Sequence, residues 1–212
     1  MSPVTHHIPE EMLLAYASGA LPHAFAVVVA SHVSLCAECR ATVEACDALG
    51  GAALEALDAP EPSADLKART LAALDAGRAP IPALAAATGL YPSAIMAELG
   101  GREPRWKSLG AGIKQTILHA GSEGTVRLLY IPGGKAVPDH AHNGLEMTMV
   151  LQGAFADHTG RFAAGDVQVV EEDLEHTPMA EDGPPCICLA ATDAPLRFRA
   201  FIPRMLQPIF RI

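Results

Sequence analysis

Positive charge and aromatic side chains are scarce in this sequence. Its 212 residues include 15 Lys and Arg against 24 Asp and Glu, which gives a net charge of −9, and only 5% of the residues are aromatic. Proteins that bind nucleic acids neutralise phosphates with clustered Lys and Arg, so this composition argues against direct nucleic-acid binding. An acidic chain is better suited to a partner that has a basic surface.

The sequence also shows no targeting signal and no apolar run of membrane-spanning length. The first ten residues, MSPVTHHIPE, have neither the positive charge nor the apolar run of a signal peptide. The stretch ALPHAFAVVVASH is interrupted by Pro22 and His23 and is too short to span a bilayer. We therefore expect a cytoplasmic protein without membrane association. The five cysteines then favour metal binding or redox chemistry over disulfides.

Two kinds of sequence pattern divide the chain. Residues 1–80 are rich in alanine and leucine at helical spacing, and residues 81–105 form a proline-interrupted linker with local helix around 92–99. Residues 106–196 contain short runs such as VRLLYIPGG and LEMTMVLQG between turn signals, which is typical of an antiparallel barrel or jelly roll. The sequence predicts an α+β protein with an all-α N-terminal domain and an all-β C-terminal domain, followed by a strand and tail over 197–212.

Turn and capping residues predict the ends of the N-terminal helices. A first helix contains Pro9 in its first turn. A longer helix runs through FAVVVASHVSLC, and the next one begins near Cys39 and stops at Gly50–Gly51. Ser63 fits the N-cap of a further helix, whose apolar stripe consists of Leu66, Leu71 and Leu74.

Three metal-binding side chains lie within eight positions of the N-terminal domain: His32, Cys36 and Cys39. His32 and Cys36 are four residues apart and share a helix face, and the cysteines form a C-x2-C clamp. Zinc prefers tetrahedral nitrogen and sulfur ligands, and its structural sites use four protein ligands. The alternative interpretation is a set of small buried residues with a core histidine. The candidates for a fourth ligand are His6, His7 and Cys46.

The order of these residues resembles the zinc-binding domain of anti-sigma factors. HIPEEMLLAYASGAL followed by HVSLCAEC matches that family's histidine before the first helix and its H-x3-C-x2-C motif, over roughly residues 5–80. The resemblance implies a domain that binds a sigma factor of the extracytoplasmic-function type. It also implies four zinc ligands, with His6 as the competitor of the first: His7, His32, Cys36 and Cys39.

A second histidine-rich motif lies in GGKAVPDHAHNGLEMTMVLQG. From Gly134 its spacing is G-x5-H-x-H-x3-E-x6-G, which resembles the first motif of cupins. On a strand, His140 and His142 point to the same face because side chains alternate, and Glu146 returns on the paired strand. Three ligands then converge at the mouth of a barrel.

The second cupin motif is matched less completely. GDVQVVEEDLEHTPM contains Gly165 and, eleven residues later, His176, as the family does. Glu171, Asp173 and Ala180 stand where the family has proline, glycine and asparagine. The resemblance implies a site for zinc or another divalent transition metal, held by His140, His142, Glu146 and His176. The alternative is a barrel with polar histidines and no metal.

The remaining chemistry-bearing residues are less specific. Cys186 and Cys188 lie on a predicted strand, so both thiols face the same side. If that side is the barrel interior, they are candidates for oxidation near the metal; otherwise they are small buried residues. Cys46 is expected in the core, and His119 and His158 on the surface.

A zinc anti-sigma domain followed by a cupin is similar to the arrangement of ChrR-like anti-sigma factors. The resemblance implies a non-enzymatic regulator that inhibits its sigma factor and releases it in response to singlet oxygen or related oxidants. The alternatives are a metal-dependent cupin dioxygenase or isomerase with an accessory zinc domain, and a metal-buffering protein. Lys114, His119 and Arg127 are candidate catalytic groups by residue type alone. Homodimerisation is compatible with a cupin.

Overall fold

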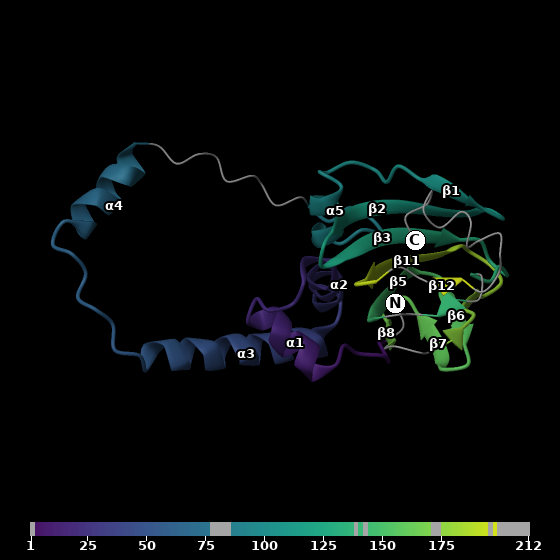
Figure 1. Cartoon of the computed structure of the whole chain (residues 1–212), viewed down its shortest axis with the longest axis horizontal. Coiled ribbons are helices and arrows are strands. Elements are labelled where there is room, and N and C mark those ends of the chain that lie inside the picture. Colours follow the sequence, from purple (N-terminus) through teal and green to yellow (C-terminus); the bar gives the residue numbers. More distant parts are fainter. Residues whose placement is uncertain are drawn as a thin grey trace.

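The computed structural model shows a helical N-terminal part and a C-terminal part made of β-sheets (Figure 1). It describes residues 3–76, 86–137, 140–141, 144–170, 175–194 and 197–198, with the backbone alone at 140–141, 175–176 and 197–198. This arrangement confirms the predicted combination of an all-α N-terminal region with an all-β cupin-like region.

Three of the described helices begin directly after a proline. These helices are α1 (Glu10–Ala17), α2 (His23–Val33) and α5 (Ser93–Glu98). Each preceding proline lies near φ −55° with an extended ψ, and the fixed φ of proline sets the direction in which the helix starts. Pro9 therefore lies just before α1 rather than inside its first turn. The other two helices are α3 (Ala37–Glu55) and α4 (Leu66–Asp75).

Two predicted helix boundaries were wrong. The helix α3 continues through Gly50–Gly51, because a glycine in a helix costs only about 1 kcal/mol and does not break the hydrogen-bond ladder. The helix α4 begins at Leu66 rather than directly after Ser63, with Asp65 at the cap position. The Ser63 hydroxyl bonds to the Asp65 carboxylate, and this is the main cause of the lowered pKa of Asp65.

The described residues of the C-terminal part form three antiparallel sheets. The largest has the strand order β1-β2-β3-β11-β5-β8, and the smaller ones have the orders β10-β6-β7 and β12-β4-β9. The strands are β1 (Lys107–Gly110), β2 (Ile113–Gly121), β3 (Gly124–Ile131), β4 (His140–Ala141), β5 (Glu146–Gln152), β6 (Ala154–Asp157), β7 (Gly160–Ala163), β8 (Val167–Val170), β9 (Glu175–His176), β10 (Met179–Ala180), β11 (Cys186–Thr192) and β12 (Arg197–Phe198).

Helix α2 covers one face of the large sheet and joins the two parts of the chain. It packs against β3, β5 and β11, and Val28 of α2 belongs to the same buried cluster as Leu128, Met147 and Leu189 of those strands. Helix α5 lies against both α2 and β2, with Ile95 fully buried. Each such side chain contributes about 1.5–3 kcal/mol by burial. The helical part and the sheet therefore share a core, and the domain limits at residues 80 and 105 stay predictions.

Helices α3 and α4 extend away from this core at one end of the molecule (Figure 1). In α3 the only buried residue is Cys39, and α4 has none. Over the described part of the chain, no single helix is long and apolar enough to cross a membrane. Helices α2 and α3 reach that length and composition only as a pair, and they are bent by 117° relative to each other.

Candidate metal centres

Four side chains of the helical part converge on one point. His7 lies in the extended segment before α1, His32 in the last turn of α2, and Cys36 and Cys39 at the start of α3. One ligand atom from each lies within 4.8 Å of all the others. His32 Nε2 is 3.3 Å from Cys39 Sγ. His7 Nδ1 is 3.3 Å from Cys36 Sγ and 3.6 Å from Cys39 Sγ.

A tight turn between α2 and α3 produces this arrangement. The carbonyl oxygen of His32 accepts hydrogen bonds from the N–H groups of Leu35 and Cys36, at 2.9 and 2.8 Å. The chain therefore reverses over a few residues, which puts Cys36 at the cap position of α3 and Cys39 in its first turn. Helix α1 packs against α3 and so keeps His7 close to the start of that helix.

Burial determines the protonation of two of these ligands. Burial lowers the pKa of His32 from 6.5 to about 4, although its hydrogen bond to the Gly165 carbonyl acts in the opposite direction. A neutral ring that donates its Nδ1–H to Gly165 O, 3.0 Å away, leaves the Nε2 lone pair facing Cys39. Burial also raises the pKa of the Cys39 thiol to about 11, against the hydrogen bond from the Ile8 N–H. A cation bound to Cys39 would displace the thiol proton.

The donor set fits zinc. A tetrahedral site with Zn–S of about 2.3 Å and Zn–N of about 2.0–2.1 Å has N···S separations of about 3.6 Å, and the observed separations are 3.3–3.6 Å. Each imidazole also has an outer partner of the kind that orients metal ligands. His32 has the Gly165 carbonyl, and His7 Nε2 lies 3.4 Å from Glu38 Oε2. Zinc held by these four residues would fasten α1, α2 and α3 together.

The neighbouring histidine, His6, has different surroundings. Its ring lies 4.4 Å from the ring of Phe162, and its Nδ1 is 3.5 Å from Asp166 Oδ2. Of the two histidines that competed for the fourth position, the structure thus brings His7 to the cysteines. His6 lies against the β7–β8 turn instead.

This β7–β8 turn fixes the segment that carries His7. Asp166 is 3% exposed. Its Oδ1 accepts from the N–H groups of Thr5 and His6 at 2.7 and 2.9 Å, and its Oδ2 accepts from Ala163 N–H at 2.8 Å. Burial would raise the pKa of Asp166, but these donors outweigh it and hold the pKa below 3.8. Val167 N–H also donates to His6 O at 3.1 Å.

The β7–β8 turn was missed by sequence reasoning. Gly165 was recognised only as a glycine of the second cupin motif, and Asp166 was not singled out. Both act on residues more than 130 positions away in the chain, and no local pattern encodes such a contact.

One ligand of the predicted cupin site, Glu146, has a described side chain. It lies in the interior of the β-sheet part. Glu146 is 8% exposed and accepts a hydrogen bond from Thr148 Oγ1 at 2.9 Å. Buried Arg127 lies on the same face and donates to Gln115 Oε1 at 3.4 Å. Burial lowers the pKa of Arg127 to about 10, and the charge of Glu146 partly offsets this effect. A buried carboxylate of this kind is suited to a cation.

The histidines predicted for the same site are only partly described. His140 of β4 and His176 of β9 are direct partners in the antiparallel register, so the backbone brings these two positions together. Their side chains and all of His142 lie outside the described residues. The four-ligand set of the cupin site therefore stays a prediction.

The two cysteines of β11 lie on the same side of their strand, as their spacing predicts, and the structure shows that this side is the interior that contains Glu146. Cys186 and Cys188 are 0% and 1% exposed, and their Sγ atoms are 3.5 Å apart. The hydrogen bond to Cys186 is the main cause that raises the pKa of Cys188 well above its ordinary value; burial and the charge of Glu146 add to it. The Cys188 thiol is therefore protonated at neutral pH, and both thiols are shielded from solvent.

Two other predictions need correction. Cys46 was expected in the core, but it is half-buried on α3. His119 was expected on the surface, but it is half-buried, and its ring centroid lies 4.7 Å from that of His23. The surface prediction for His158 is confirmed.

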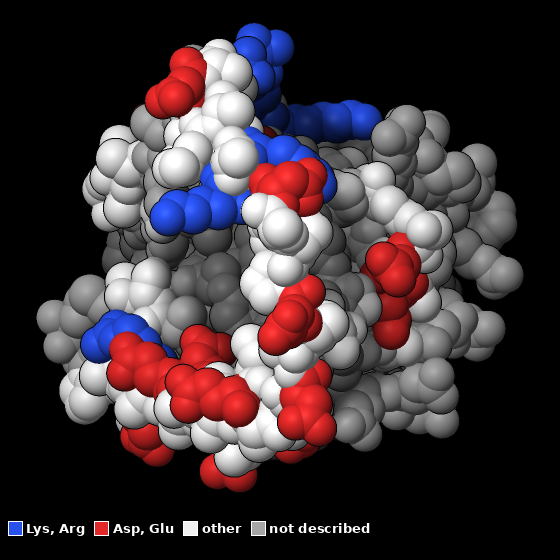
Figure 2. Space-filling view, turned by 90° about the vertical axis from the view of Figure 1, so that its left-hand side faces the viewer, with Lys and Arg blue, Asp and Glu red and all other residues white. Residues whose placement is uncertain are grey.

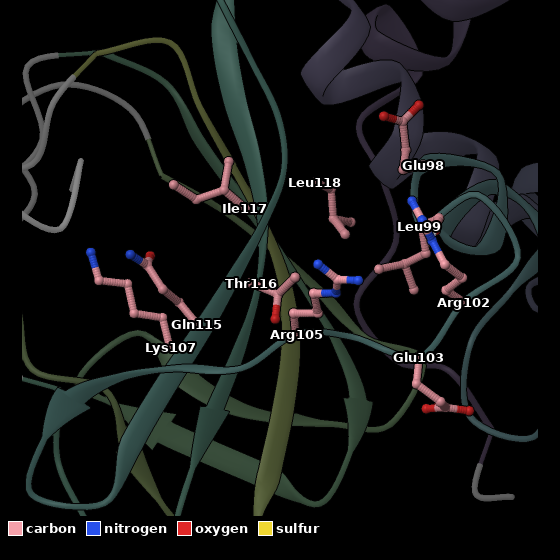
Figure 3. A pocket seen from close by; sticks show the side chains of 10 residues that line it. All are labelled: Glu98, Leu99, Arg102, Glu103, Arg105, Lys107, Gln115, Thr116, Ile117 and Leu118. Carbon is pink, nitrogen blue, oxygen red and sulfur yellow. Dashed lines mark hydrogen bonds between the residues drawn. The ribbon is translucent and has the colours of Figure 1, made fainter.

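The candidate catalytic groups do not meet around one cavity. Lys114 is exposed with its Nζ 5.1 Å from the centre of the Tyr130 ring, Arg127 is buried, and His119 lies near α2. A groove of about 600 Å³ lies between α5, the segment that follows it, and β2 (Figure 3). Its charged lining side chains are of both signs: Glu98, Glu103, Arg102, Arg105 and Lys107.

Comparisons with known proteins point to one family. A family model described as the ChrR cupin-like domain matches residues 101–194. The protein called anti-sigma-E factor ChrR from Cereibacter sphaeroides is 50% identical over 212 residues, which is 99% of each chain. A crystal structure of Rhodobacter sphaeroides SigE in complex with the anti-sigma ChrR matches with 49% identity and a TM-score of 0.77, and the match covers 90% of this chain and 99% of that chain.

Proposed function

Because this chain belongs to the ChrR family of anti-sigma factors, we propose that it binds and inhibits an extracytoplasmic-function sigma factor through residues 1–80. Zinc at His7, His32, Cys36 and Cys39 would hold the helices that make this contact. As an anti-sigma factor homologue, the chain is a non-enzymatic regulator, in agreement with the sequence prediction. The observation that carries the proposal is 49% identity, over 90% of this chain, to a protein solved in complex with SigE.

The exposed surface of α3 and α4 supports this function. Six leucines on and after these helices are 43–71% solvent-exposed, and large exposed apolar patches on a monomer mark sites of protein–protein interaction. Helix α4 projects from the molecule without a buried residue (Figure 1). A partner that covered α3, α4 and the segment between them would bury the exposed leucines: Leu49, Leu54, Leu57, Leu66, Leu71 and Leu74.

The charge of the same region favours a basic partner. Figure 2 shows acidic side chains along α3 and the segment that follows it. All of the acidic residues from 38 to 65 are exposed: Glu38, Glu44, Asp47, Glu55, Asp58, Glu61 and Asp65. Opposite charge on the partner would speed association and fix its orientation.

Binding can be tested with the full chain and a sigma factor of the SigE type. Replacing Leu66, Leu71 and Leu74 with Ser removes the apolar stripe of α4. We expect a loss of about 2 kcal/mol or more, which is about 30-fold in Kd, measured by calorimetry. The matched control is Met179→Ser, which removes an equally exposed apolar side chain from β10. Equal affinity of the triple variant and the control would reject α4 as part of the interface.

We further propose that the cupin domain controls the release of the sigma factor in response to singlet oxygen or related oxidants. The sensing elements would be a metal at His140, His142, Glu146 and His176, and the thiols of Cys186 and Cys188. The β7–β8 turn supplies a physical route, since Gly165 contacts the zinc ligand His32 and Asp166 holds the segment before His7. Release requires that the sigma factor bind the resting state more tightly than the signalled state.

Release can be measured on the preformed complex. Singlet oxygen generated by a photosensitiser should dissociate the sigma factor from the wild-type protein, as followed by fluorescence anisotropy of labelled sigma factor. A Glu146→Gln variant should bind the sigma factor normally and respond less. A complex of this variant that dissociates as readily as the wild type would exclude a role of the cupin site in sensing.

A further inference from the structure

Three side chains from three separate elements meet at the junction between the helical part and the sheet. They are His23 at the start of α2, Glu98 at the end of α5, and His119 on β2. One ligand atom from each lies within 4.8 Å of the other two. His23 Nε2 is 2.9 Å from Glu98 Oε1, and the rings of His23 and His119 have their centres 4.7 Å apart at 67°.

A β-bulge brings His119 into this group. The pairing of β2 with β3 shifts between Ile117 and His119, so that Ile117 pairs with Arg127 and His119 with Val126. Paired residues share a face of the sheet, and Val126 belongs to the buried cluster that contains the core residues of α2. In an unbroken alternation His119 would lie on the face of Ile117 and Arg127. The bulge instead turns it toward α2, and bulges are common where a side chain must be re-aimed.

A hydrogen bond between His23 and Glu98 would explain why these two side chains lie together, but not why His119 lies beside them. His119 is brought next to them by an irregularity of its strand, and the three residues are far apart in the sequence. Figure 3 shows the Glu98 carboxylate turned away from Lys107 and Gln115, which lie further along the groove. His23 is exposed and the other two are half-buried, so an ion can reach the group from solvent.

We propose that His23, Glu98 and His119 form a further metal site for a divalent transition ion of the zinc type. Two imidazole nitrogens and one carboxylate oxygen are a common ligand set for such ions, with the remaining positions taken by water. This site is separate from the His7, His32, Cys36 and Cys39 cluster and from the predicted cupin site. An ion bound here would connect α2, α5 and β2, and would stabilise the packing of the helical part on the sheet.

Metal counting on the full chain tests this proposal. Wild-type protein and variants are dialysed against the same zinc-buffered solution, and bound zinc is measured by mass spectrometry. We expect His119→Ala and Glu98→Gln each to bind one zinc ion fewer than the wild type. The matched control is His158→Ala, which removes an exposed histidine from the β6–β7 turn and should bind as many ions as the wild type. The other metal sites are the same in the wild type and in the variants. Their occupancy therefore does not contribute to the difference in zinc count.

A second variant and a second measurement keep the test valid if His119→Ala does not fold correctly. Glu98→Gln preserves the size of the side chain, so it reports on the site even where His119→Ala disturbs the packing of β2. Zinc should raise the melting temperature of the wild type more than that of Glu98→Gln. Equal zinc counts for wild type, Glu98→Gln and His119→Ala would overturn the proposal, and so would an equal loss in His158→Ala. Neither result depends on sigma-factor binding.

Discussion

Replacing Asp166 with Ala should detach the N-terminal segment from the cupin domain without unfolding the sheet. The change removes the acceptor for the N–H groups of Thr5 and His6, which lie 2.7 and 2.9 Å from Oδ1. Hydrogen bonds to a charged group contribute about 1.5–3 kcal/mol each. Thr5 is exposed and His6 half-buried, so their freed N–H groups regain water and the lower end of the range applies. Two bonds then amount to about 3 kcal/mol, which is about 100-fold in the opening equilibrium.

Amide hydrogen exchange at Val167 measures this opening. Its N–H donates to the His6 carbonyl, so it is protected only while the segment is docked. We expect Asp166→Ala to speed exchange at Val167 by about 100-fold, whereas amides in the middle of β11 keep their protection. Asp166→Asn retains one acceptor oxygen for Thr5 and His6 and should have a smaller effect.

The control for loss of charge is Glu123→Ala, in the exposed turn between β2 and β3. It should leave exchange at Val167 unchanged. Unaltered protection of Val167 in a folded Asp166→Ala protein would refute the reasoning. The segment would then be held by other contacts, and the β7–β8 turn would not act on His7.

Three further outcomes are expected. Zinc removal by a chelator, or Cys39→Ser, should lower the helical circular dichroism signal by the share of α3, because Cys39 is the only buried residue of that helix; an unchanged signal would contradict this. Burial lowers the pKa of His32 from 6.5 to about 4, so between these values the unfolded chain binds a proton that the folded metal-free chain does not. The metal-free protein should therefore lose up to about 3 kcal/mol of unfolding free energy as the pH falls from 6.5 to 4, and denaturant titrations that show no such loss would refute the burial argument. Changing Cys186 and Cys188 together to Ala should cost about 1–3 kcal/mol of stability and weaken oxidant-induced release in the anisotropy assay; full release would exclude the thiols as sensors.

Local spacing explains why much of the His/Cys cluster was predictable. His32, Cys36 and Cys39 lie within one helix end and the turn that follows it, and such a unit positions its side chains by short-range geometry alone. The choice between His6 and His7 required the tertiary structure. Neighbouring residues of an extended segment point to opposite sides, so one ring contacts the start of α3 and the other contacts Phe162 and Asp166.

Features that depend on packing could not be predicted. His119 was expected on the surface, and the bulge that turns it toward α2 follows from pairing with β3. Gly50–Gly51 reads as a helix stop, yet α3 continues through it. The packing of α2 on the large sheet was also not predicted. The sequence of α2 is nearly all apolar, which predicts that the helix is buried but not which element it packs against.

The two nitrogens of the His32 ring face two different parts of the molecule. Nε2 points to the sulfur of Cys39, and Nδ1 to the backbone of the β7–β8 turn. Binding equilibria that share a group are reciprocal. Whatever the docked turn adds to the affinity for a metal ion at this ring, the ion adds to the stability of docking by the same factor. The dissociation constant of that ion then reports whether the β7–β8 turn is docked against the helices.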